Sequence, residues 1–192
     1  MKFLNPDNIW FSSDLHLNHT NILRYDNREF STIKEHDETI INNWNKEVAP
    51  NGNVLFLGDF CFGDSSTAEN YIKRLNGNII FIKGNHEKPL CGYLTKNKLK
   101  WYDYLEIKVR DETLERKWQG LCLFHYPIFE WNKGHHGSWH LHGHCHGNCE
   151  INKNNTSTKK MLDMGTNLWK YTPVSYRRIK SIMNKRENIT HN

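Results

Sequence analysis

The chain has 192 residues, a formal net charge of +5 and five cysteines scattered along its length. A chain of this length folds as one domain and buries about 70% of its unfolded surface, so we expect a single domain over residues 1–192. No stretch reaches the roughly 18 apolar residues of a membrane span, and no apolar segment follows Lys2 as in a signal peptide. The scattered cysteines do not form a disulfide framework, which predicts a reducing, cytoplasmic location. The oligomeric state is left open.

The apolar pattern predicts alternating strands and helices in the first half of the chain and mainly strands in the second. Thr32 and Glu35 form a capping box that begins a long helix, and Asn76-Gly77 ends a helix that begins near Ser66. We expect strands at 8–13, 53–57, 78–83, 101–110, 118–125, 138–143 and 158–164. We expect helices near 19–25, from Thr32 to about 48, from Ser66 to about Leu75 and from Pro173 to about 185, with a charged turn at 111–117 and a hairpin loop at 152–155. This order predicts a mixed α/β sandwich.

Polar residues follow five of the predicted strands, each at the point where the strand ends. In chain order they are Asp14-Leu15-His16, Gly58-Asp59, Gly84-Asn85-His86, His125 and Gly143-His144-Cys145-His146. Strand ends at one edge of an open α/β sheet converge on a crevice where ligands bind, so residues far apart in sequence can meet there. Strand alternation predicts that Asp14 and His16 point to the same face, as do His144 and His146.

The chemistry of these residues predicts a metal centre. Two carboxylates, an amide oxygen and four imidazoles are donors that suit Mn²⁺, Fe, Zn²⁺ or Ni²⁺. Seven ligands are too many for one tetrahedral ion and suit two ions that share a carboxylate. Gly58, Gly84 and Gly143 remove a side chain where the backbone must turn sharply or approach a ligand closely.

In type, order and spacing these five blocks resemble the signature blocks of the calcineurin-like metallophosphoesterase superfamily. The segment His125–Gly147 is similar, more narrowly, to small bacterial and phage phosphoesterases of that superfamily. The resemblance implies two facing mixed β-sheets flanked by helices, in a four-layer sandwich. It implies a phosphoesterase with two divalent metal ions, for which Mn²⁺ is the expected metal and Fe, Zn²⁺ and Ni²⁺ are alternatives.

The resemblance also assigns a role to each residue of the blocks. It implies that one metal is held by Asp14, His16, Asp59 and His146. It implies that the other is held by Asp59, Asn85, His125 and His144, with Asp59 bridging the two. His86 is then not a ligand; it is expected to be catalytic, meeting the scissile phosphate or the leaving group. A hydroxide bridging the metals would attack a phosphodiester or phosphomonoester, with a small nucleotide or a nucleic-acid end as the candidate substrate.

The chain departs from the superfamily pattern at two places. In several branches a polar residue three positions after the bridging aspartate orients the catalytic histidine, but Phe62 occupies that position here, and Asp64 lies two residues further on. The Asp-Arg-Gly continuation of protein Ser/Thr phosphatases is absent after Asp59, which argues against a phosphoprotein phosphatase.

Several histidines and basic residues have both a functional and an ordinary interpretation. His19, Arg24 and Arg28 follow the first block and are candidate substrate contacts, through a guanidinium fork on phosphate, or surface charges. His140 and His142 are expected to orient ligands or to pack, and Cys145 to face away from the site by strand alternation. The basic residues of the last predicted helix form either a solvated face or a nucleic-acid contact.

Two other functions remain as alternatives at this stage. One is a non-catalytic binding protein on the same scaffold. The other is a zinc-stabilised nucleic-acid binder built on residues 135–149, for which Cys145 or Cys149 would hold the metal.

Overall fold

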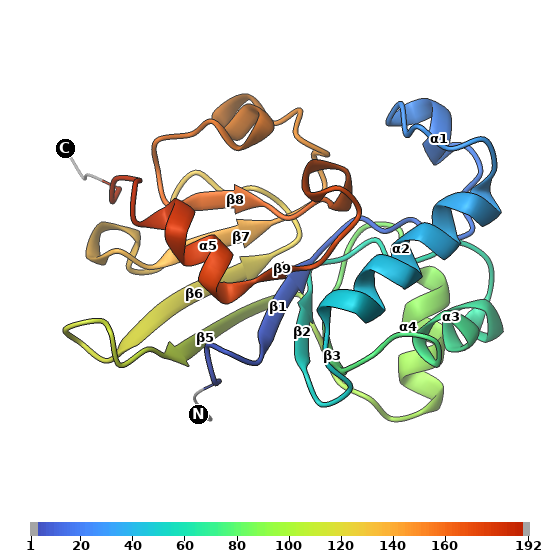
Figure 1. Ribbon diagram of the computed structural model, residues 1–192, viewed down its shortest axis with the longest axis horizontal. Coiled ribbons are helices and arrows are strands. Elements are labelled where there is room, and N and C mark those ends of the chain that lie inside the picture. Colours follow the sequence, from blue (N-terminus) through green and yellow to red (C-terminus); the bar gives the residue numbers. More distant parts are fainter. Residues whose placement is uncertain (1–3, 190–192) are drawn as a thin grey trace.

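Two mixed β-sheets face each other in the computed structural model, which describes residues 4–189 (Figure 1). The first is a five-stranded sheet in the order β4-β3-β2-β1-β9. Its strands are β4 (Trp101–Tyr102), β3 (Asn78–Ile82), β2 (Asn53–Phe56), β1 (Ile9–Ser12) and β9 (Val174–Ser175). All neighbouring pairs are parallel except β1 with β9. The prediction of two facing mixed sheets flanked by helices is confirmed.

The second sheet has four strands in the order β5-β6-β7-β8. They are β5 (Tyr104–Arg110), β6 (Trp118–Phe124), β7 (Trp139–His142) and β8 (Met161–Asp163). The β5–β6 pair is antiparallel, and β6-β7-β8 are parallel. The segment between β7 and β8 therefore crosses over and is not the predicted hairpin loop; it carries the 3₁₀ helix Glu150–Asn155.

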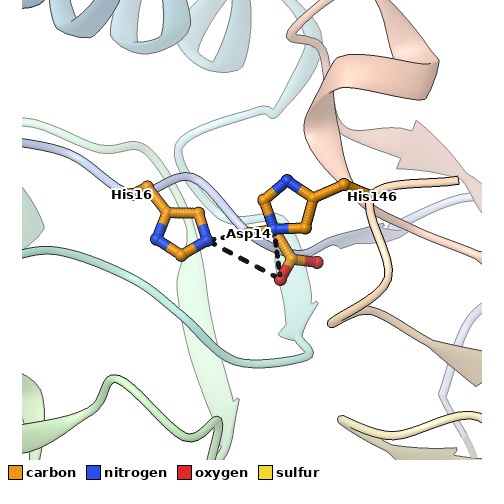
Figure 2. Close-up of side chains that lie close together, drawn as sticks. All are labelled: Asp14, His16 and His146. Carbon is orange, nitrogen blue, oxygen red and sulfur yellow. Dashed lines mark hydrogen bonds and ion pairs between the residues drawn. The ribbon is translucent and has the colours of Figure 1, made fainter. Parts of the chain in front are cut away.

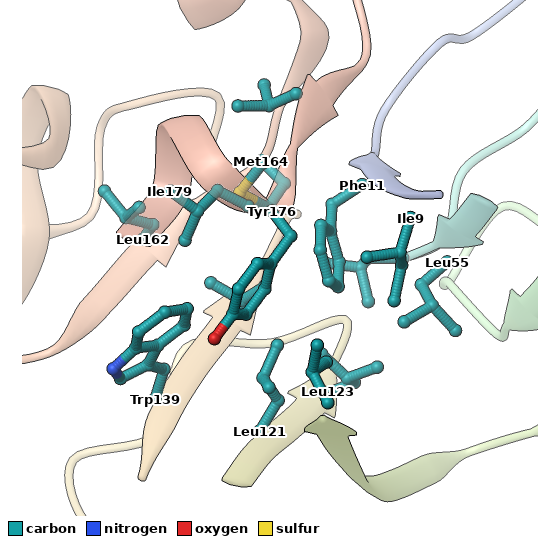
Figure 3. Packing of buried hydrophobic residues seen from close by; sticks show 14 of the residues in the cluster. Ile9, Phe11, Leu55, Leu121, Leu123, Trp139, Leu162, Met164, Tyr176 and Ile179 are labelled. Atoms are coloured by element: carbon teal, nitrogen blue, oxygen red, sulfur yellow. The ribbon is translucent and has the colours of Figure 1, made fainter. Parts of the chain in front are cut away.

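The main core lies between the two sheets (Figure 3). Ile9, Phe11 and Leu55 of the first sheet face Leu121 and Leu123 of the second. Helix α5 (Tyr176–Met183) packs onto the same core, where the Tyr176 ring stacks on Trp139 with centroids 5.3 Å apart. Strand β9 separates Pro173 from this helix, so the helix begins later than Pro173 predicts.

Three helices cover the outer face of the first sheet. They are α2 (Ile33–Glu47), α3 (Ser65–Ile72) and α4 (Lys88–Lys96), and Ile40, Trp44, Ala68 and Leu90 bury their apolar faces. The Thr32 cap of α2 is confirmed, because its hydroxyl accepts a hydrogen bond from the Glu35 amide at 3.1 Å. Helix α3 is capped by Asp64 and not by Ser66. Helix α4 has no counterpart among the predicted elements, because its Pro and Gly weaken the helical signal.

Two local features complete the frame. A short helix α1 (Ile22–Tyr25) precedes α2. The predicted strand 101–110 is divided at Asp103, so β4 joins the first sheet and β5 the second.

All five cysteines are free, as predicted. Among residues 4–189, no helix has the length and apolar character needed to cross a bilayer.

Candidate metal centre

The predicted ligands all lie just beyond the carboxyl ends of strands in the two sheets. Asp14 follows β1, Asp59 follows β2 and Asn85 follows β3, while His125 and His144 follow β6 and β7. Within each sheet these strands are parallel, so their carboxyl ends share an edge. The polar side chains therefore meet at one place, as the sequence predicts.

Asp14, His16 and His146 form a group that could hold a metal ion (Figure 2). The two imidazole Nε2 atoms are 3.2 Å apart. Asp14 Oδ1 lies 3.6 Å from Nε2 of His146 and 4.0 Å from Nε2 of His16. One cation placed among these three atoms would contact an oxygen and two nitrogens.

A second group, Asp14, Asp59 and His125, shares Asp14 with the first. The Oδ2 atom of Asp59 lies 3.7 Å from Nε2 of His16 and 3.6 Å from Nε2 of His125. Asn85 Oδ1 lies 2.9 Å from Nε2 of His125 and 2.9 Å from Nδ1 of His144. One carboxylate oxygen thus stands between imidazoles of both groups, which is the arrangement that a shared ligand requires.

The backbone at these residues is left-handed and not extended. The φ angles are positive at Asp14 (55°), His16 (50°), Asp59 (60°), His144 (71°) and His146 (48°). Strand alternation is therefore the wrong reason for the shared direction of Asp14 and His16, and of His144 and His146. Left-handed non-glycine residues cost energy and cluster at functional sites.

Two of the glycines allow carboxylates to approach the neighbouring backbone. A Cβ on Gly84 would collide with Oδ1 and the backbone nitrogen of Asp59, and one on Gly143 would collide with Ser13 Oγ and Asp14 Oδ2. The close approach predicted for these glycines is therefore present.

The electrostatics of the site favour a bound cation. Burial, together with the nearby Asp163 and Asp59 carboxylates, raises the pKa of Asp14 to about 7, although His146 opposes this. Burial lowers the pKa of His16 well below its ordinary value, so its imidazole is neutral. A divalent cation would relieve the repulsion between the crowded carboxylates, and the neutral imidazole of His16 is the form that binds a metal.

Asp26 is a candidate site residue that the sequence did not reveal. Its Oδ2 atom lies 2.9 Å from Nδ1 of His146 and accepts a hydrogen bond from Nε of Arg28 at 2.8 Å. Burial alone would lower the pKa of His146, but Asp26 and Asp14 raise it above its ordinary value. A carboxylate on the outer ring nitrogen fixes the orientation of a ligating histidine. No spacing signal marks Asp26, because only the folded loop brings it to His146.

A cavity of about 420 Å³ opens over these groups. Its walls include His16, His19, Phe62, His86 and Cys145. His19 stacks on Phe62 with ring centroids 3.7 Å apart, and Phe62 lies 5.4 Å from the ring of His86. The His86 amide donates to Asp59 Oδ1 at 2.8 Å, which fixes its backbone beside the metal groups.

Comparisons with known proteins agree with this geometry. The model of the family described as calcineurin-like phosphoesterase matches residues 8–186. The chain belongs to this family. It is 44% identical to "Uncharacterized protein MJ1445" of Methanocaldococcus jannaschii over 82 residues, which is 42% of this chain and only 47% of that relative's length. It is 25% identical to "Gene 66 protein" of Mycobacterium phage D29 over 185 residues, covering 84% of this chain and 89% of the relative.

One solved structure has the same fold. The protein of unknown function AQ665 from Aquifex aeolicus superposes with a TM-score of 0.66 at 22% identity. The superposition covers 91% of this chain and 98% of that one. At this identity the likeness shows the fold alone.

The arginines predicted as phosphate contacts do not line the cavity. Arg28 is only 4% exposed, and its guanidinium donates to the carbonyls of Asp14 and Leu15 at 2.8 and 2.9 Å and contacts His36. Arg28 therefore holds the backbone that follows β1 and does not reach the cavity. The substrate contact predicted for Arg28 is wrong. Arg24 is exposed and lies over the Tyr25 ring, outside the cavity wall.

Cys145 also differs from its prediction, because it lines the cavity instead of facing away. Strand alternation fails here because β7 ends at His142, and Cys145 lies in the following loop. Even so, the groups of described residues that could hold a metal contain no cysteine. Burial and the neighbouring Cys149 raise the pKa of the Cys145 thiol to about 12, so it is not a thiolate.

His140, His142 and Asp64 are engaged within the fold. His140 accepts a hydrogen bond from the Ile128 amide, and His142 contacts Asn152, so both pack as predicted. Asp64 accepts hydrogen bonds from Ser66 and Thr67 as the cap of α3 and does not reach His86.

Proposed function

We propose that this chain is a dinuclear metal-dependent phosphoesterase that hydrolyses a phosphodiester or phosphomonoester. The observation that supports this most directly is the position of Asp59 Oδ2, between the imidazoles of His16 and His125. A single cation would need only one of the two groups, whereas both groups together supply the ligands of two cations. Membership of the phosphoesterase family supports the same reaction class.

In this proposal the two ions have separate ligands and one shared ligand. Asp14, His16, Asp59 and His146 hold one, and Asp59, Asn85, His125 and His144 hold the other. We expect Mn²⁺, with Fe, Zn²⁺ or Ni²⁺ as alternatives that suit the same donors. Two such ions clamp the phosphate, acidify a water and stabilise the in-line displacement.

His86 is the residue that we propose to act on the substrate. It lies in the cavity wall and is no part of either group of metal donors. Its backbone is fixed by the hydrogen bond to Asp59, while its exposed side chain can turn towards the departing oxygen. There it would donate a proton or a hydrogen bond, which favours esters with poor leaving groups such as natural diesters.

The cavity supports a nucleotide or a nucleic-acid end as the substrate. Its volume of about 420 Å³ is within the range of small-molecule sites. Its wall includes Tyr25, which offers a ring face to a base. Tyr25 is 63% exposed, so little needs to move for a base to reach it.

The test is a count of bound metal combined with a substrate screen. Protein loaded with Mn²⁺ should hold two ions per chain by elemental analysis, and Asp59→Ala should lose both. The loaded parent should hydrolyse at least one of a panel of phosphate monoesters, diesters, cyclic nucleotides and oligonucleotides. One tightly held ion that survives Asp59→Ala would refute the dinuclear centre. Two bound ions without any hydrolysis would favour a binding protein on this scaffold.

A further inference from the structure

The outer face of β5 and β6 is a second surface, and none of its residues belongs to the groups that could hold a metal. Residues of β5 and β6 alternate between the core and this face, and Leu121 and Leu123 point into the core. Tyr104, Glu106 and Lys108 therefore point outward, opposite Phe124, Cys122 and Gly120 of β6. Figure 1 shows β5 and β6 running from the middle of the molecule to its far end.

One end of this face carries cations gathered around Trp118. The ammonium of Lys108 lies 4.1 Å from the Trp118 ring centroid, and the guanidinium of Arg116 lies 5.6 Å from it. Both residues line a narrow hollow of about 50 Å³, with Lys133 and His136 on its other side. A hollow of this size holds a few water molecules or one phosphate group, but not a nucleoside.

These cations have no acidic partners. None of Lys108, Arg116 and Lys133 takes part in an ion pair with any residue in the range 4–189. Glu106 is the acidic residue of the hollow, and its carboxylate already accepts hydrogen bonds from Tyr104 and Asn132, both at 2.8 Å. The hollow thus presents uncompensated positive charge, which attracts phosphate.

The other end of the face is aromatic and reaches the metal centre. The ring centroid of Phe124 lies 6.2 Å from that of Tyr104 and 5.3 Å from that of Tyr126, and Tyr126 lies 4.6 Å from His144. Tyr104 is 41% exposed and Tyr126 is 36% exposed. These rings form an open row that ends at a residue of the metal centre.

The cationic and aromatic ends are joined along β5 by Tyr104, Glu106 and Lys108, because Trp131 and Ile128 cover Cys122 in the middle of β6. Trp118 and Phe124 are the first and last residues of β6, which places them about 20 Å apart along the strand. A groove with positive charge for the backbone and aromatic rings for the bases is how proteins bind single-stranded nucleic acid. A small anion would need only the hollow, and an apolar partner would need only the rings.

We infer that the outer face of β5 and β6 binds single-stranded nucleic acid and leads one end of the strand to the metal centre. Lys108 and Arg116 contact backbone phosphates, and bases pack on Tyr104 and Tyr126. The direction of the strand towards His144 depends on the phosphoesterase function proposed above; the binding itself does not.

Binding is tested by fluorescence anisotropy with a fluorescein-labelled 15-nucleotide oligothymidylate, in EDTA, between 50 and 200 mM KCl. The Lys108→Ala/Arg116→Ala variant should bind at least ten-fold more weakly, and its salt slope should fall by about 1.4, or 0.7 for each lost contact. Lys34→Ala/Lys46→Ala removes two exposed cations of α2 and is the matched control, with no expected change. Tyr104→Leu should weaken binding roughly 5- to 100-fold without changing the salt slope, and Tyr104→Phe should restore it.

Hydrolysis of bis(4-nitrophenyl) phosphate with Mn²⁺ separates this inference from the proposed function. None of these variants should change that hydrolysis, because none touches the metal groups. A parent protein that hydrolyses the small ester but does not bind the oligonucleotide would overturn the inference and leave the function standing. The inference would also be overturned if the α2 control lost as much affinity as the β5–β6 variants. Equal affinity for a duplex of the same length would overturn it as well. Oligonucleotide binding without any hydrolysis would refute the proposed function alone.

Discussion

Asp26 offers a sharp test of the metal centre, because it touches one metal group and not the other. Its carboxylate holds Nδ1 of His146 and the guanidinium of Arg28 through the same oxygen. Asp26→Asn keeps the shape and an acceptor oxygen but removes the charge. Asp26→Ala removes the contact altogether.

The expected magnitude follows from the contact that is lost. Removing a carboxylate that orients a ligating histidine typically costs 10- to 100-fold in metal affinity. We expect Asp26→Ala near the upper end of this range, since His146 is then free to rotate, and Asp26→Asn near the lower end. The loss should affect only the ion held by Asp14, His16 and His146. The fold should survive, because Arg28 keeps its bonds to two backbone carbonyls.

The assay is calorimetric titration of metal-free protein with Mn²⁺, fitted to two sites, with thermal unfolding measured on each variant. Asp64→Asn is the matched control, because Asp64 caps α3 away from the cavity and should leave both affinities unchanged. An equal loss at both sites, or no loss at either in a folded Asp26→Ala variant, would refute the proposed role of Asp26.

Three further predictions follow from other parts of the molecule. His86→Ala should retain both metals yet lose about 10²–10⁴-fold in turnover, with a smaller loss for a nitrophenyl ester; an equal loss for good and poor leaving groups would assign His86 to phosphate binding. Cys145→Ser/Cys149→Ser should keep its metal content by elemental analysis and most of its activity, whereas loss of metal would require a zinc site there. Burial would raise the pKa of Asp111, but hydrogen bonds from Lys180, Thr113 and Tyr176 lower it to about 2. The stabilisation that ionised Asp111 provides is therefore present above about pH 4 and is lost as the pH falls towards 2. Asp111→Asn should therefore lower the free energy of unfolding by about 1–2 kcal/mol at pH 7 in urea, and a difference that does not shrink below pH 4 would contradict this.

The sequence by itself predicted which residues meet at the candidate metal centre. Asp14, Asp59, Asn85 and His125 each follow a short apolar strand, and parallel strands bring their carboxyl ends to one edge. Topology therefore made these residues neighbours regardless of the local backbone. The helix that begins at Thr32 was also predictable, because a capping box and a helical apolar stripe are local signals.

The tertiary structure decided how those residues point and what surrounds them. Asp14, His16 and Asp59 adopt left-handed φ angles, which no alternation pattern predicts and which only the surrounding packing maintains. Arg28 is buried and unavailable to a substrate, because its guanidinium donates hydrogen bonds to the carbonyls of Asp14 and Leu15 just beyond β1.

The same reason explains the other differences from the sequence prediction. The division of residues 101–110 at Asp103 and the contact between Asp26 and His146 both depend on which distant segments pair. Local propensity carries no information about such pairing. The sequence therefore predicts the residues of the candidate centre. Their backbone geometry and the contacts that hold them, such as Asp26 with His146, depend on the packing of the tertiary structure.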